Sequence, residues 1–507
     1  MKGKVYLVGA GPGDPGLLTL KGKTVLERAD CVVYDFLANP ALLRFARADC
    51  ERILVGKHGV TRKISQEEIN QLLVSRAREG KTVCRLKGGD PFLFGRGGEE
   101  AQELAAAGIP FEIVPGVSAA YAVPAYAGIP VTHRGFASAV NCATAHEDSS
   151  KGESSIDWSE IAASQGTLVF FMGAKKFPEV TARLIACGRD PQTPVAVIRW
   201  GSLPKQQVFT GTLADMASKT MGIMPPAIIV VGEVVQLRDQ LNWFERLPLF
   251  GKRIAITRAA EQAGALSDEL TALGAEVIEV ATIEIRDPMS WEPLDSAVRR
   301  LKEFDYVLLT SANGVRSLFR RLKACGRDAR ELKGMIIGAI GPATASELAG
   351  SGVSADIVPR EYTAEGLLSA LGDRDLHGKT VLIPRAKVAR NVLPRVLAEK
   401  GAHVEVVEAY ETVIPKLPSG ELQRLLSPAP DVITFTSSST ASNFAKLAGE
   451  LDLPELLRGA AIASIGPITS TTIRDMGFQV KIEARDSTMA GLVRAIEEYF
   501  RSLNPAD

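Results

Sequence analysis

Residues 1–20, MKGKVYLVGAGPGDPGLLTL, contain a short apolar strand that runs directly into a glycine-rich turn at residues 8–15. Glycines at the end of a strand usually hold the backbone close to a ligand, most often a phosphate group. Here Pro12 and Asp14 stand where a phosphate-binding loop needs free amides and no negative charge. The turn therefore raises the question of which ligand needs close backbone contact without a phosphate cradle.

Three interpretations of this turn compete. The first is a dinucleotide-binding fingerprint, in which Gly9 and Gly11 fit and Asp35 stands at a suitable distance to hold a ribose. Against it, Asp14 replaces the third glycine of that fingerprint. The second is a P-loop, which fails because no Gly-Lys-Ser/Thr follows. The third is a tight turn, held by its two prolines, that lets the backbone approach an uncharged or cationic ligand.

A second glycine run, CRLKGGDPFLFGRGGEE, follows another strand at residues 84–100. Small residues permit close contact with a ligand, and the loop backbone is free to hydrogen-bond an adenosine or an amino-acid carboxylate. Asp90 is a candidate acceptor for a ribose hydroxyl or an ammonium group. The alternative is a purely structural turn. Two such turns together favour the third interpretation.

The composition is typical of a soluble globular protein of several domains. A chain of 507 residues is too long for one ordinary domain, which predicts three or four. Acidic and basic residues balance at 59 each, so no basic field favours nucleic acid or an anionic membrane. The six cysteines form no CxxC pair and no metal-ligand spacing. Without a signal-peptide core or a long apolar run, we expect a cytoplasmic protein with no membrane segment.

Apolar strands alternate with amphipathic helices along the whole chain, which predicts an α/β fold. The first-half strands are expected at KVYLVGAG, CVVYDF, TVCRL and FEIVPG, with helices at EEINQLLVSRAREG and GEEAQELAAAG. A second α/β unit is predicted from TLVFFMGA, PVAVIRWG and PAIIVVGEVV, with a boundary near residues 115–116. An aromatic, proline-bearing connector at residues 241–251 then leads into a separate C-terminal part.

The C-terminal part contains an internal duplication. GKRIAITR begins at residue 251, and GKTVLIPR begins 127 residues later, at residue 378. Matching blocks follow in the same order: DYVLLTSANGV with DVITFTSSSTA, then IGAIGPATASELAGSGV with IASIGPITSTTIRDMGF. Such a duplication predicts two pseudo-symmetric lobes with the ligand between them.

Several motifs spread over residues 1–245 occur together: VYLVGAGPGDPGLLTL, VVYD, GKHG, RLKGGDPFLFGRGGEE, PGVSA, GIPVTHR, TLVFFMG and PPAIIVVGEVV. This set resembles the uroporphyrinogen-III C-methyltransferases of the tetrapyrrole methylase family. The resemblance implies a two-domain tetrapyrrole methylase fold with subdomains of about 1–115 and 116–245, followed by a linker at 246–250. It also implies S-adenosylmethionine as methyl donor, with S-adenosylhomocysteine as product. A positive sulfonium needs no phosphate cradle, which answers the question raised by the first turn.

The resemblance implies roles for residues at matching positions. Asp35 in VVYD is implied as the proton acceptor and Lys57 in GKHG as the proton donor. A helix-capping carboxylate and a solvated surface lysine are the respective alternatives. Methylation of a pyrrole carbon leaves a cationic ring that must lose a proton, so a carboxylate at a strand end is well placed. The residues implied to line the cofactor pocket are Pro12, Gly88, Gly89, Asp90, Leu93, Ser118, Ala119, Met172 and Gly201.

The tetrapyrrole substrate of this family carries several carboxylates, which arginine side chains can pair. Arg85, Arg96 and Arg134 are the candidates in the first part of the chain. The polar segment HEDSSKGESSIDW, residues 146–158, is either a lid over the substrate or an ordinary surface loop.

Residues 251–507 contain, in this order, ITR, TSANGV, GPATA, AYETV, FTSSSTA and GPITS. The order and the duplication resemble the uroporphyrinogen-III synthases. This resemblance implies two α/β lobes joined by two linker strands. Lobe one would combine about 251–285 with 415–507, and lobe two would span about 286–414.

The strand-to-helix junctions of this part offer free amides and positive helix-dipole ends to substrate carboxylates. The resemblance implies carboxylate contacts from Ser311, Thr344, Ser438 and Thr469, with Arg258 and Arg385 nearby. Tyr410, in EAYETV, matches the family's tyrosine proposed to help the substrate hydroxyl depart. Ordinary helix caps and a half-buried strand tyrosine are the alternatives.

Together the two resemblances predict a bifunctional enzyme. The C-terminal part would cyclise hydroxymethylbilane to uroporphyrinogen III with inversion of ring D. The N-terminal part would methylate that product at C-2 and C-7 to precorrin-2, on the way to sirohaem or cobalamin. Two alternatives stay open: a methylase of a later corrin intermediate, and a C-terminal half that only binds tetrapyrrole as a regulatory module. We expect no metal, no nucleic-acid partner, and a homodimer formed through the methyltransferase unit.

Overall fold

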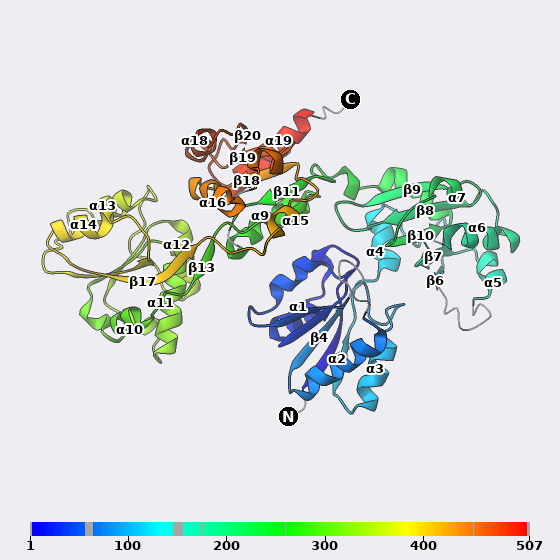
Figure 1. The fold of residues 1–507 in the computed structure, drawn as a ribbon, viewed down its shortest axis with the longest axis horizontal. Helices are drawn as coiled ribbons and strands as arrows, with labels where there is room; N and C mark the ends of the chain where they lie inside the picture. Colours follow the sequence, from blue (N-terminus) through cyan, green and yellow to red (C-terminus); the bar gives the residue numbers. More distant parts are fainter. Residues whose placement is uncertain are drawn as a thin grey trace. The chain divides into compact units, whose positions relative to one another are not determined.

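The computed structural model describes residues 3–55, 64–145, 156–173, 176–258, 260–449 and 451–503. Within these ranges the strands form four five-stranded sheets (Figure 1). The chain divides into two compact units, one chiefly Met1–Arg253 and the other chiefly Ile254–Ser267 with Ile278–Ile496. The α/β class expected from the sequence is confirmed.

The first sheet is parallel and has the strand order β3-β2-β4-β1-β5. Its strands are β1 (Lys4–Gly9), β2 (Cys31–Tyr34), β3 (Glu51–Leu54), β4 (Thr82–Lys87) and β5 (Phe111–Val114). The helices that cover it are α1 (Leu20–Arg28), α2 (Gln66–Arg78) and α3 (Gly97–Ala106), visible around β4 in Figure 1.

Each face of this first sheet has its own apolar core, because strand side chains alternate between the faces. Val8 and Leu86 pack with Leu26 of α1 on one face. On the other face, Val83 packs with Leu73 of α2 and with residues of α3. Side chains two and four residues after Val83 therefore also point toward α2 and α3, although they are Arg85 and Lys87.

The second sheet has the order β6-β7-β10-β8-β9 and is mixed. The strands β6 and β7 run parallel, whereas β10 pairs antiparallel with both β7 and β8. Its strands are β6 (Val140–Thr144), β7 (Thr167–Phe171), β8 (Pro194–Arg199), β9 (Gln207–Thr212) and β10 (Ala227–Val231). The helices of this part are α4 (Ala119–Tyr126), α5 (Trp158–Ala163), α6 (Phe177–Ala186), α7 (Met216–Lys219) and α8 (Arg238–Leu241).

The aromatic connector after α8 is packed against α4. Phe244 is 5% exposed, and its ring centroid lies 4.8 Å from that of Tyr126. The indole Nε1 of Trp243 donates to the carbonyl of Ala125 at 3.1 Å. These contacts fasten residues 243–244 to the end of α4.

The third sheet has the order β12-β11-β18-β19-β20, and its strands from β11 to β20 pair in parallel. Its strands are β11 (Arg253–Ile256), β12 (Glu276–Glu279), β18 (Val432–Phe435), β19 (Ala461–Ser464) and β20 (Val480–Glu483). The helices among them are α9 (Ala260–Ala272), α15 (Glu421–Leu425), α16 (Ser438–Ala448), α17 (Leu453–Leu456), α18 (Pro467–Asp475) and α19 (Met489–Leu503).

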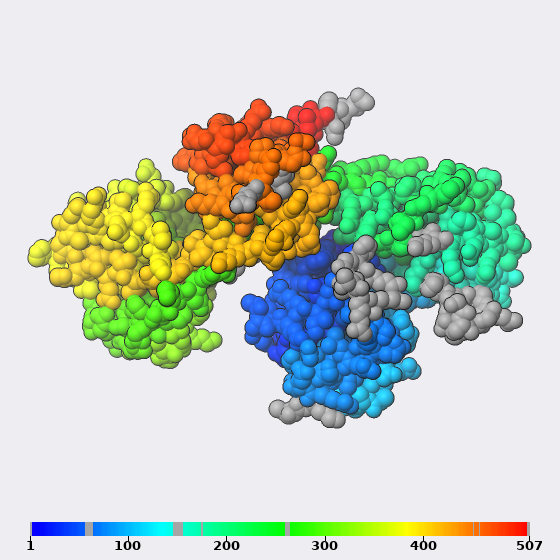
Figure 2. All heavy atoms as spheres, viewed as in Figure 1, coloured from blue at the N-terminus to red at the C-terminus, as the bar shows by residue number. Residues whose placement is uncertain are grey.

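The fourth sheet has the order β13-β17-β16-β14-β15. Its strands are β13 (Glu284–Arg286), β14 (Tyr306–Leu309), β15 (Ile336–Ala339), β16 (Thr380–Ala386) and β17 (His403–Val413). The helices are α10 (Glu292–Arg299), α11 (Ala312–Ala324), α12 (Pro342–Gly350), α13 (Ala364–Leu371) and α14 (Val392–Glu399). These residues gather in one mass, yellow-green to yellow in Figure 2. The strand β13 pairs antiparallel with the last three residues of β17, whereas β17 pairs parallel with β16.

Candidate functional site

The two glycine turns found in the sequence are hydrogen-bonded to each other. They follow β1 and β4, which are neighbours in the first sheet. The amide of Gly89 donates to the carbonyl of Gly11 at 2.7 Å, and the amide of Gly11 donates to the carbonyl of Gly89 at 3.2 Å. Pro12 and Gly88 directly flank this pair. The carboxyl edge of a parallel sheet is where α/β folds usually bind ligands.

A side chain cannot be accommodated where these turns meet the end of β5. A Cβ built on Gly9 would lie 2.4 Å from the Cα of Gly116 and 2.7 Å from the carbonyl oxygen of Gly89. Three glycine backbones thus pack directly on one another. We call Gly9, Gly89 and Gly116 the glycine ledge; it presents backbone, and no side chain, at the strand ends.

Two carboxylates in the turns bond to the protein itself. Asp90 accepts from the amide of Phe92 at 2.8 Å and from the amide of Gly116 at 2.9 Å, so it ties the second turn to the loop after β5. Asp14 accepts from the amide of Gly16 at 2.7 Å and from the hydroxyl of Tyr126 at 2.6 Å. The charge of Asp14 that looked out of place for a phosphate site is therefore engaged in holding the first turn.

The start of α4 lies next to the glycine ledge in the chain. Ser118 is 4% exposed and caps this helix, since its Oγ accepts from the amide of Ala120 at 3.2 Å. Ala119 is the first residue of the helix. Leu93, in the second glycine loop, packs against the apolar cluster that contains Ala120 and Val123.

Left-handed backbone conformations at non-glycine residues occur in the second glycine loop and in the loops after β7 and β8. Such conformations are strained, and they are found most often where function requires them. In the described part of the chain they occur at Phe94, Arg96, Met172, Trp200 and Ser202. The predicted residues Met172 and Gly201 lie at or between these positions. A Cβ on Gly201 would come within 2.3 Å of Val123, so this loop also passes close to α4.

Exposed apolar side chains surround these loops. Phe92 is 55% exposed and Met172 is 50% exposed, whereas most large apolar residues of the described chain are buried. The rings of Phe94 and Phe171 lie 4.9 Å apart, and those of Phe36 and Trp200 lie 6.2 Å apart. Both ring pairs join the first sheet's loops to the second sheet's loops. An apolar surface of this kind suits a flat, ring-shaped ligand.

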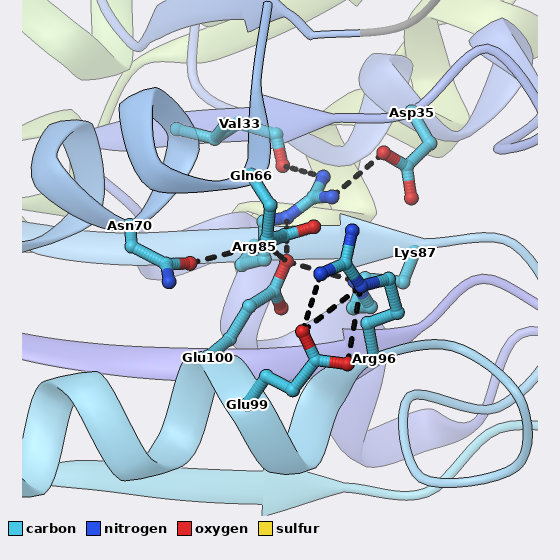
Figure 3. A network of polar contacts seen from close by, with 9 residues as sticks. All are labelled: Val33, Asp35, Gln66, Asn70, Arg85, Lys87, Arg96, Glu99 and Glu100. Carbon is cyan, nitrogen blue, oxygen red and sulfur yellow. Dashed lines mark hydrogen bonds and ion pairs between the residues drawn. The ribbon is translucent and has the colours of Figure 1, made fainter. Parts of the chain in front are cut away.

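Asp35 lies directly after β2 and is held by a buried arginine. The Nη2 of Arg85 donates to Oδ1 of Asp35 at 2.7 Å (Figure 3). The Asp35 side chain is 28% exposed, whereas that of Arg85 is 2% exposed. The next helix, η2 (Pro40–Phe45), is capped by Asn39, so the helix-cap alternative for Asp35 is wrong. Lys57 lies outside the described residues, as does most of the 146–158 segment.

Arg85 differs from the other two arginines predicted to bind substrate. Beyond Asp35, its Nε donates to Oε1 of Glu100 at 3.1 Å, inside the first sheet's α2–α3 face. Arg96 is the N-terminal cap residue of α3 and pairs with Glu99, which raises the pKa of its guanidinium. Arg134 is exposed in the turn between His133 and Ala137. Arg96 and Arg134 are thus at the surface, and Arg85 is inside.

In the fourth sheet, two predicted residues contact each other. The hydroxyl of Tyr410 donates to Oγ of Ser311 at 3.0 Å, while Ser311 also caps α11 by accepting from the amide of Gly314. Arg385, near the end of β16, donates to the carbonyl of Arg390 and to Oδ1 of Asn391. Thr344 is 3% exposed in the first turn of α12.

In the third sheet, Ser438 begins α16 and contacts α18. Its Oγ accepts from the hydroxyl of Thr472 at 2.8 Å, and the cap of α16 is the preceding Ser437. Thr469 is 5% exposed near the start of α18. Arg258 follows β11, and burial lowers the pKa of its guanidinium.

The predicted residues of the third and fourth sheets share one topological position. Except for Tyr410, each lies at the carboxyl end of a strand or at the start of the following helix: Arg258, Ser311, Thr344, Arg385, Ser438 and Thr469. Helix N-termini at such edges favour anions. Within the described ranges, no three His, Cys, Asp or Glu side chains are grouped so as to hold a metal ion. Nor does any described helix have the length and apolar character needed to cross a membrane.

Two family models match the chain. Residues 4–217 match the family described as Tetrapyrrole (Corrin/Porphyrin) Methylases, and residues 264–494 match Uroporphyrinogen-III synthase HemD.

Relatives match across both parts. The chain is 36% identical over 499 residues to the porphyrin biosynthesis protein HemD of Ruminiclostridium josui, with 98% of each chain covered. It is 45% identical over 333 residues to the uroporphyrinogen-III C-methyltransferase of Bacillus subtilis, covering 65% of this chain and 68% of that protein. A crystal structure of uroporphyrin-III C-methyl transferase from Thermus thermophilus, complexed with S-adenyl homocysteine, is 40% identical. It covers 46% of this chain and 100% of that one, with a TM-score of 0.41.

The glycine ledge predicts a sharp difference between two glycine-to-alanine substitutions. Gly9→Ala should lower the free energy of unfolding by about 2 kcal/mol, because the new Cβ must displace backbone. Gly98→Ala, on the exposed face of α3 with nothing within 4 Å of a Cβ, should leave it unchanged or raise it by up to about 1 kcal/mol. Urea unfolding followed by circular dichroism measures both. Equal stability of the two variants would contradict the close packing of the ledge.

Proposed function

The chain belongs to the tetrapyrrole methylases in its N-terminal part and to the uroporphyrinogen-III synthases in its C-terminal part, and is a bifunctional enzyme of tetrapyrrole biosynthesis. From this premise, we propose that the C-terminal part converts hydroxymethylbilane to uroporphyrinogen III with inversion of ring D. The N-terminal part then methylates that product at C-2 and C-7 to precorrin-2, with S-adenosylmethionine as the donor.

The glycine ledge and the strained loops beside it carry this proposal for the methyltransferase. S-adenosylmethionine supplies an electrophilic methyl group on a positively charged sulfur. The residues fit such a ligand, because a Cβ on Gly89 would meet nothing nearer than 3.9 Å, which leaves open space beside the second turn, and no phosphate-binding lysine motif occupies the first turn. Pro12, Gly88, Gly89, Leu93, Ser118, Ala119, Met172 and Gly201 are proposed to line this site; Asp90 is proposed to act there by holding the second turn.

The remaining task of the methyltransferase is to orient the macrocycle and remove a proton. Transfer requires the pyrrole carbon to lie about 3 Å from the methyl group, in line with the bond that breaks. The exposed Phe92 and Met172 offer an apolar surface for the ring, and the surface arginines Arg96 and Arg134 offer charges for its carboxylates. Asp35 accepts the proton that the methylated carbon loses. Its partial exposure supports this role, because the proton can then pass to water.

For the synthase, the proposal rests on the polar residues at the strand ends of the third and fourth sheets. Cyclisation of a flexible linear tetrapyrrole is chiefly a problem of bringing its two ends together. The helix N-termini and hydroxyls there are suited to hold carboxylates, together with Arg258 and Arg385. Tyr410 is proposed to assist departure of the substrate hydroxyl. Its hydrogen bond to Ser311 supports this role, because it orients the phenol.

Four further expectations stay predictions. They are the domain limits at 245 and 251 with the two lobes described above, the duplication, a cytoplasmic location, and a homodimer formed through the methyltransferase unit.

A coupled assay tests the whole proposal. The full chain is supplied with hydroxymethylbilane and methyl-labelled S-adenosylmethionine, and the products are identified by mass spectrometry after oxidation. We expect type III uroporphyrinogen first and then addition of two methyl groups. Only the type I isomer would favour a non-catalytic C-terminal module, and type III product without methylation would favour a methylase of a later corrin intermediate.

The proton-accepting role of Asp35 predicts a selective loss in Asp35→Asn. Methyl transfer should fall by about 100-fold or more, because the amide cannot accept the proton. Binding of S-adenosylhomocysteine, measured by calorimetry, should be preserved, as should synthase activity. Full methylation activity in this variant would show that another group accepts the proton.

The hydroxyl of Tyr410 predicts a smaller effect in the other active site. Tyr410→Phe should reduce the rate of type III uroporphyrinogen formation by about tenfold, which corresponds to one hydrogen bond in the transition state. The control is Tyr499→Phe, which removes a hydroxyl from helix α19, away from strand β17, and should change nothing. If both variants retain full activity, the Tyr410 hydroxyl has no part in the reaction.

A further inference from the structure

Three ionic side chains are buried beneath the methyltransferase loops, between the first sheet and α3. The exposed fractions of the Arg85, Lys87 and Glu100 side chains are 2%, 4% and 0%. Removing a charge from water costs several kcal/mol, so such a cluster is maintained against a substantial penalty. The neighbouring positions on this face of the sheet carry apolar side chains. Apolar packing alone therefore does not explain why three charged side chains are buried here.

The cluster is joined by one carboxylate oxygen. The Oε1 atom of Glu100 accepts from Nε of Arg85 at 3.1 Å, from Nζ of Lys87 at 2.9 Å and from Nε2 of Gln66 at 3.2 Å (Figure 3). Its Oε2 atom is buried and has no hydrogen-bond partner in the structure. Glu100 thus holds two cations on one side, and its single charge cannot neutralise both.

Asp35 supplies the missing negative charge. In the sheet, Arg85 lies opposite Val33 of β2, and its guanidinium reaches Asp35, which lies directly after the end of that strand. Arg85 therefore bridges a fully buried carboxylate and a partly exposed one. The two cations and two anions balance only while Asp35 is ionised.

The buried charges shift one another's pKa values. Burial favours the neutral form of Glu100, but the charges of Arg85 and Lys87 outweigh it and hold the pKa of Glu100 below its ordinary value. Burial, followed by the charge of Arg85, lowers the pKa of Lys87.

Other described groups that face the cluster are neutral or lie at its edge. The helix α2 contributes the amides of Gln66 and Asn70, which hydrogen-bond each other. Arg96, at the start of α3, acts electrostatically on Glu100, and it is itself paired with the exposed Glu99 and influenced by Glu67. The net charge of the buried side chains that act on Asp35 is therefore set chiefly by Lys87 and Glu100.

We propose that Lys87 and Glu100 are positioning residues that act on Asp35 through Arg85. They hold the arginine so that it orients the Asp35 carboxylate, and their opposite charges act on that carboxylate through it. The proposal rests on the proposed function in naming Asp35 as the proton acceptor.

This arrangement has a consequence for turnover. When Asp35 takes the proton from the methylated ring, the cluster beneath it is left with an excess positive charge. That charge favours release of the proton to water through the exposed part of Asp35. The carboxylate is then ready for the second methylation.

Single substitutions of the two residues should shift the acidic limb of the methylation pH profile in opposite directions. Lys87→Met removes a positive charge, so Asp35 takes up its proton more readily and the limb moves up by about one pH unit. Glu100→Gln removes a negative charge, so the limb moves down by about the same amount. Both substitutions nearly preserve side-chain size. If one variant does not fold, the direction in which the acidic limb shifts in the other variant still tests the proposal.

Three controls separate charge from structural damage. The double variant Lys87→Met/Glu100→Gln retains only the Arg85–Asp35 pair, so its limb should return to the wild-type position. Lys87→Arg keeps the charge and should not move the limb. Glu103→Gln, on the exposed face of the same helix, changes the same charge away from the cluster and should also leave it unmoved. Limbs that shift in the same direction in both single variants would overturn the proposal; the meaning of unmoved limbs is decided by the direct titration of Asp35.

A direct titration distinguishes this inference from the proposed function. The full chain is labelled with carboxyl-13C aspartate, the Asp35 signal is assigned by its loss in Asp35→Asn, and its midpoint is followed by NMR. Opposite midpoint shifts in the two variants with an unmoved pH–rate profile would support the cluster and reject Asp35 as proton acceptor. Unmoved midpoints would reject the cluster itself, whatever the activity does.

Discussion

The architecture of the N-terminal site depends on the absence of side chains where three strand ends meet. Gly9, Gly89 and Gly116 approach so closely that one Cβ would strike backbone. This contact brings the turns after β1 and β4 within mutual hydrogen-bonding distance. The carboxylate of Asp90 can therefore reach the loop after β5, and Asp14 can reach Tyr126. The methyltransferase proposal follows from this constraint, because the exposed backbone is what a nucleoside without phosphates can use.

Apolar strands and amphipathic helices were predictable from sequence, including β5 at one edge of the first sheet, whereas the edge strands β3 and β9 were not. Buried runs such as VYLVG and TLVFF form β1 and β7 as expected. The strand β3, ERIL, lies at a sheet edge, where two charged residues can face outward and mask the apolar signal. The strand β9, QVFTGT, is also at an edge and carries a glycine. The expected strand PAIIVVGEVV ends at Val231, because Gly232 turns the chain with a φ of 144° and a 3-10 helix follows.

The glycine turns of the site were equally predictable from sequence, because only glycine permits such close contact between backbones. The destination of individual polar side chains was not. Asp90 was expected to face a ligand, and it accepts from two backbone amides. Arg85 was expected to meet substrate carboxylates, and it is buried against Glu100, a residue on the following helix. One signal was present: two cations at alternate positions of the apolar strand TVCRLK point to the same face, which requires a buried counter-charge. Sequence spacing alone does not say which acidic residue supplies it.

The central claim is that the backbone of the two glycine turns, held together at the glycine ledge, receives the nucleoside of the methyl donor. The most direct measurement is a crystal structure of the full chain grown with S-adenosylhomocysteine. The account predicts electron density for the adenosine against the backbone of residues 11–13 and 88–89, with the homocysteine close to the start of α4. Density for the ligand elsewhere, with these turns in contact only with solvent, would contradict it.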